Sequence, residues 1–166
     1  MSAEATRQRR GPRLVPGLRA DETGLAAGTV VMTADGALPV DFLEPGDQIV
    51  TRSGMRALRE IHLRRYSGPA IRIREGALGH GRPEQALVLP AHAPVLVRDW
   101  RATAVFGRKS VVMEVDRLVD GEFIVPTEAV SMRLYDLRFD LPEIVYAEGL
   151  EIACAAAAGV IRVVAE

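Results

Sequence analysis

Three histidines, His62, His80 and His92, are the side chains in this sequence best suited to act as general bases or metal ligands near neutral pH. None has a second histidine or a cysteine at the spacing of a zinc motif, so the sequence predicts no metal site unless distant segments assemble one. His92 lies in LVLPAHAPVLV, residues 87–97, an apolar, strand-like run interrupted by proline. Its imidazole is therefore either an acid–base group or a buried ring that bonds to the backbone.

Few other groups offer catalytic chemistry. Cys154 is the single cysteine, so it forms no disulfide within the chain, and no base or cation stands beside it in sequence to activate its thiol. The serines stand in no nucleophile-elbow sequence. The glycine-rich stretch GALGHGRPEQ, residues 76–85, lacks the Lys-Ser/Thr continuation of a phosphate loop. We predict that it is a β-turn connection, and we expect no cofactor.

Two pairs of carboxylates are close enough in sequence to be considered as acid–base couples, Glu143 with Glu148 and Asp136 with Asp140. The more ordinary interpretation is that all four are surface charges, because Asp and Glu are seldom buried without a partner. We predict surface positions for them.

The overall composition disfavours several classes of partner. The formal net charge is −1 and aromatic residues make up 5% of the chain, so neither nucleic acid nor an anionic membrane is an expected partner. No stretch reaches the roughly 20 apolar residues that span a bilayer, so no membrane insertion is expected. The chain of 166 residues, 48% of them hydrophobic, is long enough for one globular domain. The remaining expectation is a protein or peptide partner of unspecified identity and oligomeric state.

Residues 1–22 are rich in arginine and lack the apolar centre of a signal peptide. This composition predicts a solvated basic tail, with a docking arm for an acidic partner as the alternative. The lack of a signal-peptide pattern and of a membrane-spanning stretch favours a cytoplasmic location, with export by a signal-independent route left open.

Short apolar runs broken by glycine and proline follow from about Gly28 onward, and they predict an all-β domain. AIRIR places Ile71 and Ile73 on one face, as in a half-buried antiparallel strand. RLYDLRFD places Asp136 on a face that is either solvated or turned toward a site. The predicted strands lie in residues 29–33, 48–51, 56–66, 70–75, 86–90, 93–99, 110–119, 122–126, 129–140 and 143–149.

The order of four sequence blocks resembles the Hint domain shared by Hedgehog C-terminal regions and inteins, in its compact bacterial form. The blocks are AAGTVVMTADGALPVDFLEPGDQIVTRSG (26–54), RIREGALGHGRPEQALVLPAHAPVLV (72–97), RLVDGEFIV (117–125) and EIVYAEGL (143–150). The resemblance covers about Gly24 to Leu150. It implies a disc-like β fold with two subdomains related by a pseudo-twofold axis.

The resemblance also implies self-cleavage, the first step of autoprocessing and of protein splicing. In the family, a cysteine at the start of the domain attacks the carbonyl that precedes it, and a histidine in the second block assists. The nucleophile must sit one Cβ from the bond it breaks, because the attack passes through a five-membered ring. His92 stands at the position of the family histidine.

Several positions depart from the family pattern. Gly24 occupies the nucleophile position, Leu89 replaces the Ser or Thr that stands three residues before the histidine, and Asp136 and Pro142 stand where bacterial relatives often carry histidine. We therefore expect a degenerate active site and a scaffold or binding module with its ligand site in the former cleft near His92.

The alternative is an active autoprocessing domain with another nucleophile. Thr23 could attack the peptide bond before it, and Thr29 could attack the Gly28–Thr29 bond, although both shift the reaction away from the family's register. The predicted organisation is a basic tail over residues 1–22, a Hint-like domain over 23–152 and a C-terminal extension over 153–166.

Overall fold

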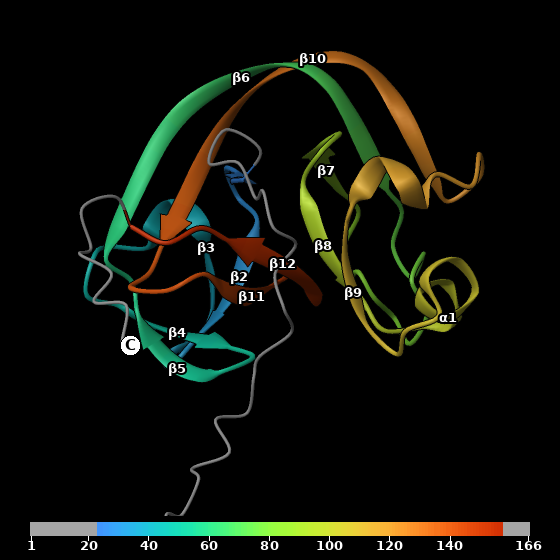
Figure 1. Ribbon diagram of the computed structural model, residues 1–166. Coiled ribbons are helices and arrows are strands. Elements are labelled where there is room, and N and C mark those ends of the chain that lie inside the picture. The colour runs from blue at the N-terminus through green and yellow to red at the C-terminus, as the bar shows by residue number, and fades with distance from the viewer. Residues whose placement is uncertain (1–22, 158–166) are drawn as a thin grey trace, which may run out of the picture.

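Two long strands, β6 (Glu60–Ile73) and β10 (Ile124–Arg138), form the frame of the molecule in the computed structural model, which describes residues 23–157. They pair antiparallel from Ile124 opposite Ile73 to Arg138 opposite Glu60. The register shifts between Thr127 and Val130. Such an irregularity lets a strand bend and twist, and the paired strands arch across the molecule in Figure 1.

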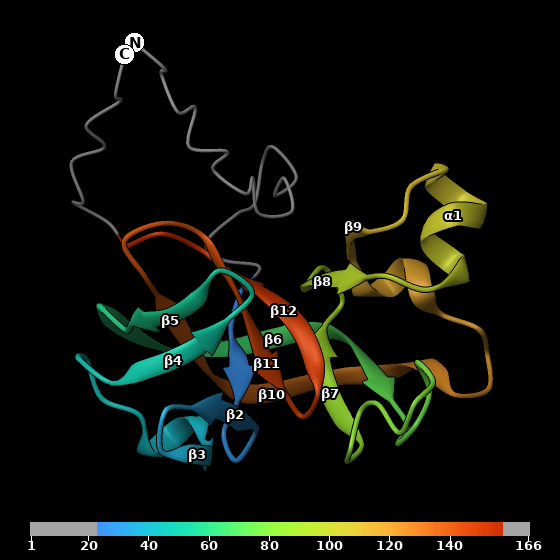
Figure 2. The same ribbon diagram turned by 90° about the horizontal axis from the view of Figure 1, so that it is seen from below.

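The other elements lie at the two ends of this arch, with β2–β5 on one side and β8, β9 and α1 on the other (Figures 1 and 2). The helical segments are α1 (Trp100–Phe106) and the 3-10 helices η2 (Val40–Phe42) and η3 (Val115–Leu118). The remaining strands are β1 (Leu25–Ala26), β2 (Val30–Thr33), β3 (Gly36–Pro39), β4 (Gln48–Thr51), β5 (Gly54–Ala57), β7 (Leu87–Pro90), β8 (Pro94–Val97), β9 (Val111–Glu114), β11 (Glu143–Ala147) and β12 (Leu150–Cys154).

The strands form two sheets. One has four strands in the order β1-β10-β6-β7, and the other has the order β3-β2-β4-β11-β12-β8-β9 with β5 added beside β4. The first sheet is curled, as shown by the contact between its two outer strands, β1 and β7. Three antiparallel pairings separate β1 from β7 in the sheet, so these two strands run in opposite directions.

The core is formed by the apolar faces of both sheets, and the alternation in AIRIR is confirmed. Ile71 and Ile73 are buried, whereas Arg72 is exposed. In the segment RLYDLRFD, Asp136 is only 1% exposed, so its side chain is turned into the protein and not toward solvent. Among the largest buried side chains are Leu25, Ile49, Leu58, Leu89, Ile124, Leu134, Leu137, Phe139 and Ile152.

Some predicted element boundaries were wrong. Residues 56–66 and 70–75 belong mainly to one continuous strand, β6, because residues 67–69 remain extended opposite β10. The run 110–119 is strand only as far as Glu114 and then turns into η3.

Helix α1 was not predicted, although local signals for it exist. The Asp99 side chain accepts a hydrogen bond from the backbone N–H of Arg101 and so caps the N-terminus, and Gly107 ends the helix in the left-handed conformation. None of the helices in the described part of the chain is long and apolar enough to cross a membrane.

The predicted domain boundaries stay predictions. The tail proposed for residues 1–22 lies outside the described residues, as do positions 158–166 of the proposed extension. Strand β12 continues to Cys154, and Ala156 forms a bridge with Phe139.

Candidate functional site

The contact between β1 and β7 brings several of the predicted site positions into the same part of the first sheet. Gly24 precedes β1, whereas Leu89 lies near the end of β7 and His92 follows it in the turn before β8. Because β1 and β7 contact each other and run in opposite directions, the start of β1 and the end of β7 lie at the same end of this sheet. The tertiary fold thus groups residues that are up to 68 positions apart in sequence.

Gly24 has a backbone that L-amino acids rarely adopt, with φ of +134°. A Cβ added at this position would lie 3.1 Å from the Cβ of Leu134 on β10, and Leu134 is fully buried. A side chain at position 24 would therefore strain the backbone and press on the core.

Four polar side chains surround the same point, and we call Thr23, Arg64, Asp136 and Arg138 the Thr23 cluster. The Thr23 hydroxyl donates a hydrogen bond of 2.6 Å to Asp136 Oδ1. The Arg138 guanidinium donates two bonds to Asp136 Oδ2, at 3.0 and 2.7 Å, and Arg64 Nη2 donates to the backbone carbonyl of Thr23. Both oxygens of this buried carboxylate are thus satisfied, as burial of a charge requires.

The remaining departures from the family pattern are apolar. Leu89 is 1% exposed and pairs with Ile71 across the β6–β7 ladder, so the position of the family's Ser or Thr has become part of the core. Pro142 lies in the short connection before β11 and is partly buried. Neither residue offers a group for proton transfer.

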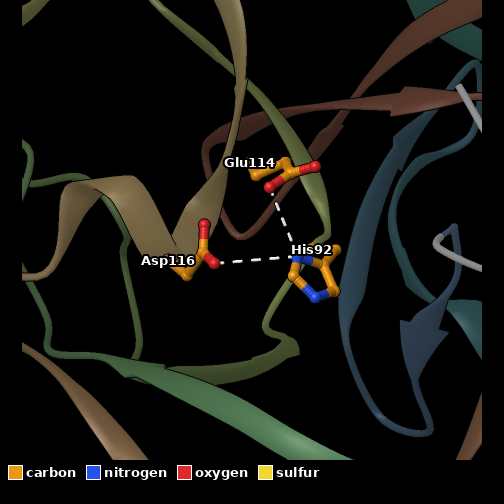
Figure 3. A group of neighbouring side chains, drawn as sticks. All are labelled: His92, Glu114 and Asp116. Atoms are coloured by element: carbon orange, nitrogen blue, oxygen red, sulfur yellow. Dashed lines mark hydrogen bonds and ion pairs between the residues drawn. The ribbon is translucent and has the colours of Figure 1, made fainter. Parts of the chain in front are cut away.

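His92 does not have the buried position that the sequence suggested, because 51% of its side chain is exposed. Its Nδ1 lies 3.3 Å from Glu114 Oε2 and 3.6 Å from Asp116 Oδ2 (Figure 3). We call these three residues the His92 cluster. The prediction of a buried ring that bonds to the backbone was wrong because the β7–β8 turn carries the side chain outward beside two carboxylates.

The other two histidines do not join this group. His80 is exposed in the loop that follows β6, and His62 Nε2 lies 2.7 Å from Glu60 Oε2 on the same strand. The spacing of histidines and cysteines did not indicate this group. The available signal was the pair of carboxylates Glu114 and Asp116, two residues apart where β9 ends.

The predicted surface positions of the carboxylates were largely wrong. Glu143 and Glu148 are buried, and only Asp140 is exposed. Glu148 Oε1 accepts a hydrogen bond of 2.8 Å from the N–H of Val30, and Arg56 lies 3.4 Å from Glu143. These charges were misassigned because their partners come from distant strands.

Glu151 was not considered in the sequence, and it is a buried carboxylate of the second sheet, 3% exposed. Its oxygens accept hydrogen bonds of 2.7 Å from Arg52 and from Arg98, whose side chains are partly exposed. The arrangement is a structural cluster of one carboxylate and two arginines rather than an acid–base couple.

Cys154 is buried, and its environment opposes ionisation. Burial raises the pKa of the thiol far above its ordinary value, and the negative charges of Asp136 and Glu143 raise it further. The thiol is therefore the neutral form near neutral pH and does not serve as a nucleophile there.

A cavity of about 430 Å³ opens between the segment after β1 and the segment that leads into β7. Ala26, Gly28, Gln85 and Leu87 line it, together with Glu148. His92 is not among the lining residues, so this cavity and the His92 cluster are separate features.

The comparisons with known proteins agree with this architecture. The model of the Hint domain family matches residues 23–156, so the chain belongs to the Hint domain family. The chain is similar to the crystal structure of the gp41-1 intein, with a TM-score of 0.51 and 13% identity over 80% of this chain and 97% of that chain. No curated protein matches the sequence.

A second solved structure gives the same result. The chain is similar to the solution structure of a bacterial intein-like domain from Clostridium thermocellum, with a TM-score of 0.51 and 15% identity over 80% of this chain and 98% of that chain. These likenesses confirm the all-β Hint fold that the four sequence blocks predicted.

Proposed function

We propose that this protein is a Hint domain that does not cleave itself and that serves as a stable scaffold or binding module. The observation that carries the proposal is the state of position 24. Gly24 has no side-chain nucleophile, its φ of +134° disfavours any side chain, and an added Cβ would lie in a tight contact of 3.1 Å with the Cβ of Leu134. The family's reaction has no attacking atom at this position.

The surroundings of the Thr23–Gly24 peptide bond support this interpretation. Arg64 donates a hydrogen bond to the Thr23 carbonyl oxygen, as a donor would if that oxygen became negatively charged during an attack. Electrostatic stabilisation of this kind accelerates a reaction only when a nucleophile is held at the carbonyl carbon. Here Arg64 instead anchors the chain where it enters β1.

The binding role rests on the cavity between β1 and β7. A volume of about 430 Å³ is within the usual range of small-ligand pockets. Its lining combines apolar side chains such as Leu87 with the charged groups of Arg72 and Glu148. This mixture suits a small polar molecule or a peptide side chain rather than a purely apolar one.

The test is the intact mass of the untagged full-length chain, measured directly after purification and after prolonged incubation with dithiothreitol or hydroxylamine. We expect one species with the mass of the complete chain, because no thioester or ester forms for either reagent to cleave. A chain that has been cut at or beside Gly24, found in the absence of protease, would overturn the proposal.

A second candidate is favoured by one observation, the hydrogen bond of 2.6 Å from the Thr23 hydroxyl to Asp136. In this scheme the Thr23 oxygen attacks the carbonyl carbon of Glu22 and gives its proton to the Asp136 carboxylate. Asp136 passes that proton to the Thr23 nitrogen as the C–N bond breaks, which leaves an ester on Thr23 and a free amine. Hydrolysis of the resulting ester by water would release residues 1–22. The two hydrogen bonds that Arg138 donates to Asp136 Oδ2 weaken this candidate, because they already engage the carboxylate in a structural ion pair.

Variants of Thr23 separate the two candidates. If the second candidate is right, residues 1–22 are lost from the wild-type chain and from Thr23→Ser, and Thr23→Ala abolishes the loss. If the first is right, all three chains keep their full mass. His92→Ala adds a further test, since loss of cleavage in this variant would restore the family histidine to an active role.

A further inference from the structure

The His92 cluster combines one imidazole nitrogen and two carboxylate oxygens from three different elements. His92 comes from the β7–β8 turn, Glu114 from the end of β9 and Asp116 from η3. The three ligand atoms all lie within 4.8 Å of one another (Figure 3). Zinc and related divalent ions are bound by this set of donor atoms, with three protein ligands and an open fourth position in many sites.

The two distances to the ring nitrogen are also compatible with a shared metal ion. His92 Nδ1 lies 3.3 Å from Glu114 Oε2, a hydrogen-bond contact, and 3.6 Å from Asp116 Oδ2. Ligand atoms bound tetrahedrally at about 2.1 Å from a metal are about 3.4 Å apart. An ion could therefore replace the direct contacts with little movement of the ring.

Asp116 faces the ring of His92 with its Oδ2, and its side chain is 34% exposed. Its Oδ1 has no hydrogen-bond partner among residues 23–157. An ion held by both oxygens of Asp116 would therefore also give Oδ1 a partner. The two carboxylates together would balance the charge of a divalent ion.

The backbone holds these side chains in place without the ion. The N–H of Asp116 donates a 3.0 Å hydrogen bond to the carbonyl of Ala91, and the N–H of Val115 donates a 2.9 Å bond to the carbonyl of Ala93. The residues on both sides of His92 are thus fastened to the segment that carries the two carboxylates. A site in which the scaffold fixes the ligands loses little entropy when it binds its ion.

We propose that His92, Glu114 and Asp116 bind one divalent transition-metal ion of the zinc type, with the fourth position open to water or to a group from a partner. The spacing of residues in the sequence did not predict this metal site. It does not depend on whether the domain cleaves itself, and no peptide-bond chemistry is assigned to it.

The proposal is tested by titrating the untagged, chelator-treated full-length chain with Zn²⁺ in a calorimeter and with Co²⁺ by visible absorption. We expect saturable binding of one ion per chain and a spectrum typical of four-coordinate Co²⁺. His92→Ala, Glu114→Gln and Asp116→Asn should each weaken binding at least about tenfold, because even changes next to metal ligands have effects of this size. All three side chains are at the surface or partly exposed, and circular dichroism verifies that the variants fold.

His62→Ala is the matched control, since His62 is also exposed and also lies beside a carboxylate, Glu60, but lacks a third ligand. This variant and His80→Ala should bind Zn²⁺ as the wild type does. The proposal is overturned if the wild type shows no saturable binding, if His92→Ala binds as tightly as the wild type, or if His62→Ala is the variant that loses binding. Displacement of Zn²⁺ by an equal concentration of Mg²⁺ or Ca²⁺ would also overturn it, because those ions prefer oxygen ligands alone.

Discussion

The environments of the Thr23 cluster and the His92 cluster differ sharply. At the Thr23 cluster, Asp136 is buried and both of its oxygens are bonded to protein groups. At the His92 cluster, the imidazole and Glu114 are half exposed, and the distances to the ring are long. The Thr23 cluster is thus part of the packed interior, whereas the His92 cluster presents polar groups to solvent.

The comparison shows that one cluster is tied into the interior and the other is not. At position 24 an added Cβ would lie 3.1 Å from the Cβ of Leu134, and Arg64 fastens the backbone beside it. Within residues 23–157, the side-chain partners of His92 are the partly exposed Glu114 and Asp116. Stability should therefore depend on the Thr23 cluster, and ligand binding on the His92 cluster.

The largest expected effect is that of Asp136→Ala, which leaves the mostly buried Arg138 without its partner. We expect a loss of about 3–5 kcal/mol in the free energy of unfolding, measured by urea denaturation. Asp140→Ala is the control, because its pair with Arg59 is exposed and its loss should change stability far less. Equal losses in the two variants would contradict the contrast between buried and exposed pairs.

Gly24→Cys comes next in size. The variant should lose about 1–3 kcal/mol of stability through backbone strain, and its intact mass should show no cleavage. Gly24→Ala and Gly28→Ala separate the two causes, because position 28 also has a positive φ but open space around its Cβ. Losses of equal size at positions 24 and 28 would show that Leu134 does not restrict the site, and efficient cleavage by Gly24→Cys would show that position 24 still has catalytic geometry.

A pH effect is expected from Cys154. Since the pKa of this thiol is raised in the folded protein, the unfolded chain releases its proton first as the pH rises. Stability from this group is complete below the ordinary pKa of 9.0 and falls by about 1.4 kcal/mol for each pH unit above it. Unfolding experiments between pH 7 and pH 10 check this, with Cys154→Ala as the reference that lacks the titration. Parallel curves for the two chains would show that the thiol is accessible to water.

The smallest effect on stability is expected for His92→Ala. Because half of the side chain is exposed and its contacts to the carboxylates are long, the change in the free energy of unfolding should stay within about 0.5 kcal/mol without added metal. A thermal-denaturation scan in the presence of a chelator measures it. A loss above about 1 kcal/mol would place His92 in the structural interior instead, and so remove the contrast between the two clusters.

The strands were largely predictable because apolar periodicity and turn residues act locally. The alternation of Ile71 and Ile73 identified the buried face of β6, and the four blocks identified the Hint fold before any geometry was known. The arch formed by β6 and β10 was less predictable, because residues 67–69 look like a turn in sequence and are kept extended only by pairing with β10.

The candidate site was predictable only in part. Gly24, Leu89 and His92 could be aligned with a family pattern, but alignment gave no information about burial. His92 and Glu143 were assigned to the wrong environments, since exposure depends on what lies across the sheet or the turn. Glu114 and Asp116 were missed because their relation to His92 exists only after β8 and β9 pair.

Sequence alone established the fold family, because it follows from residue types and their order. A glycine at position 24 has no side-chain nucleophile in any conformation, and its place in the family's reaction stays a prediction. The tertiary structure decided which charges are buried and paired and which are left open to bind an ion. That division depends on contacts between residues as distant as Thr23 and Asp136, and no local pattern specifies the distance between them.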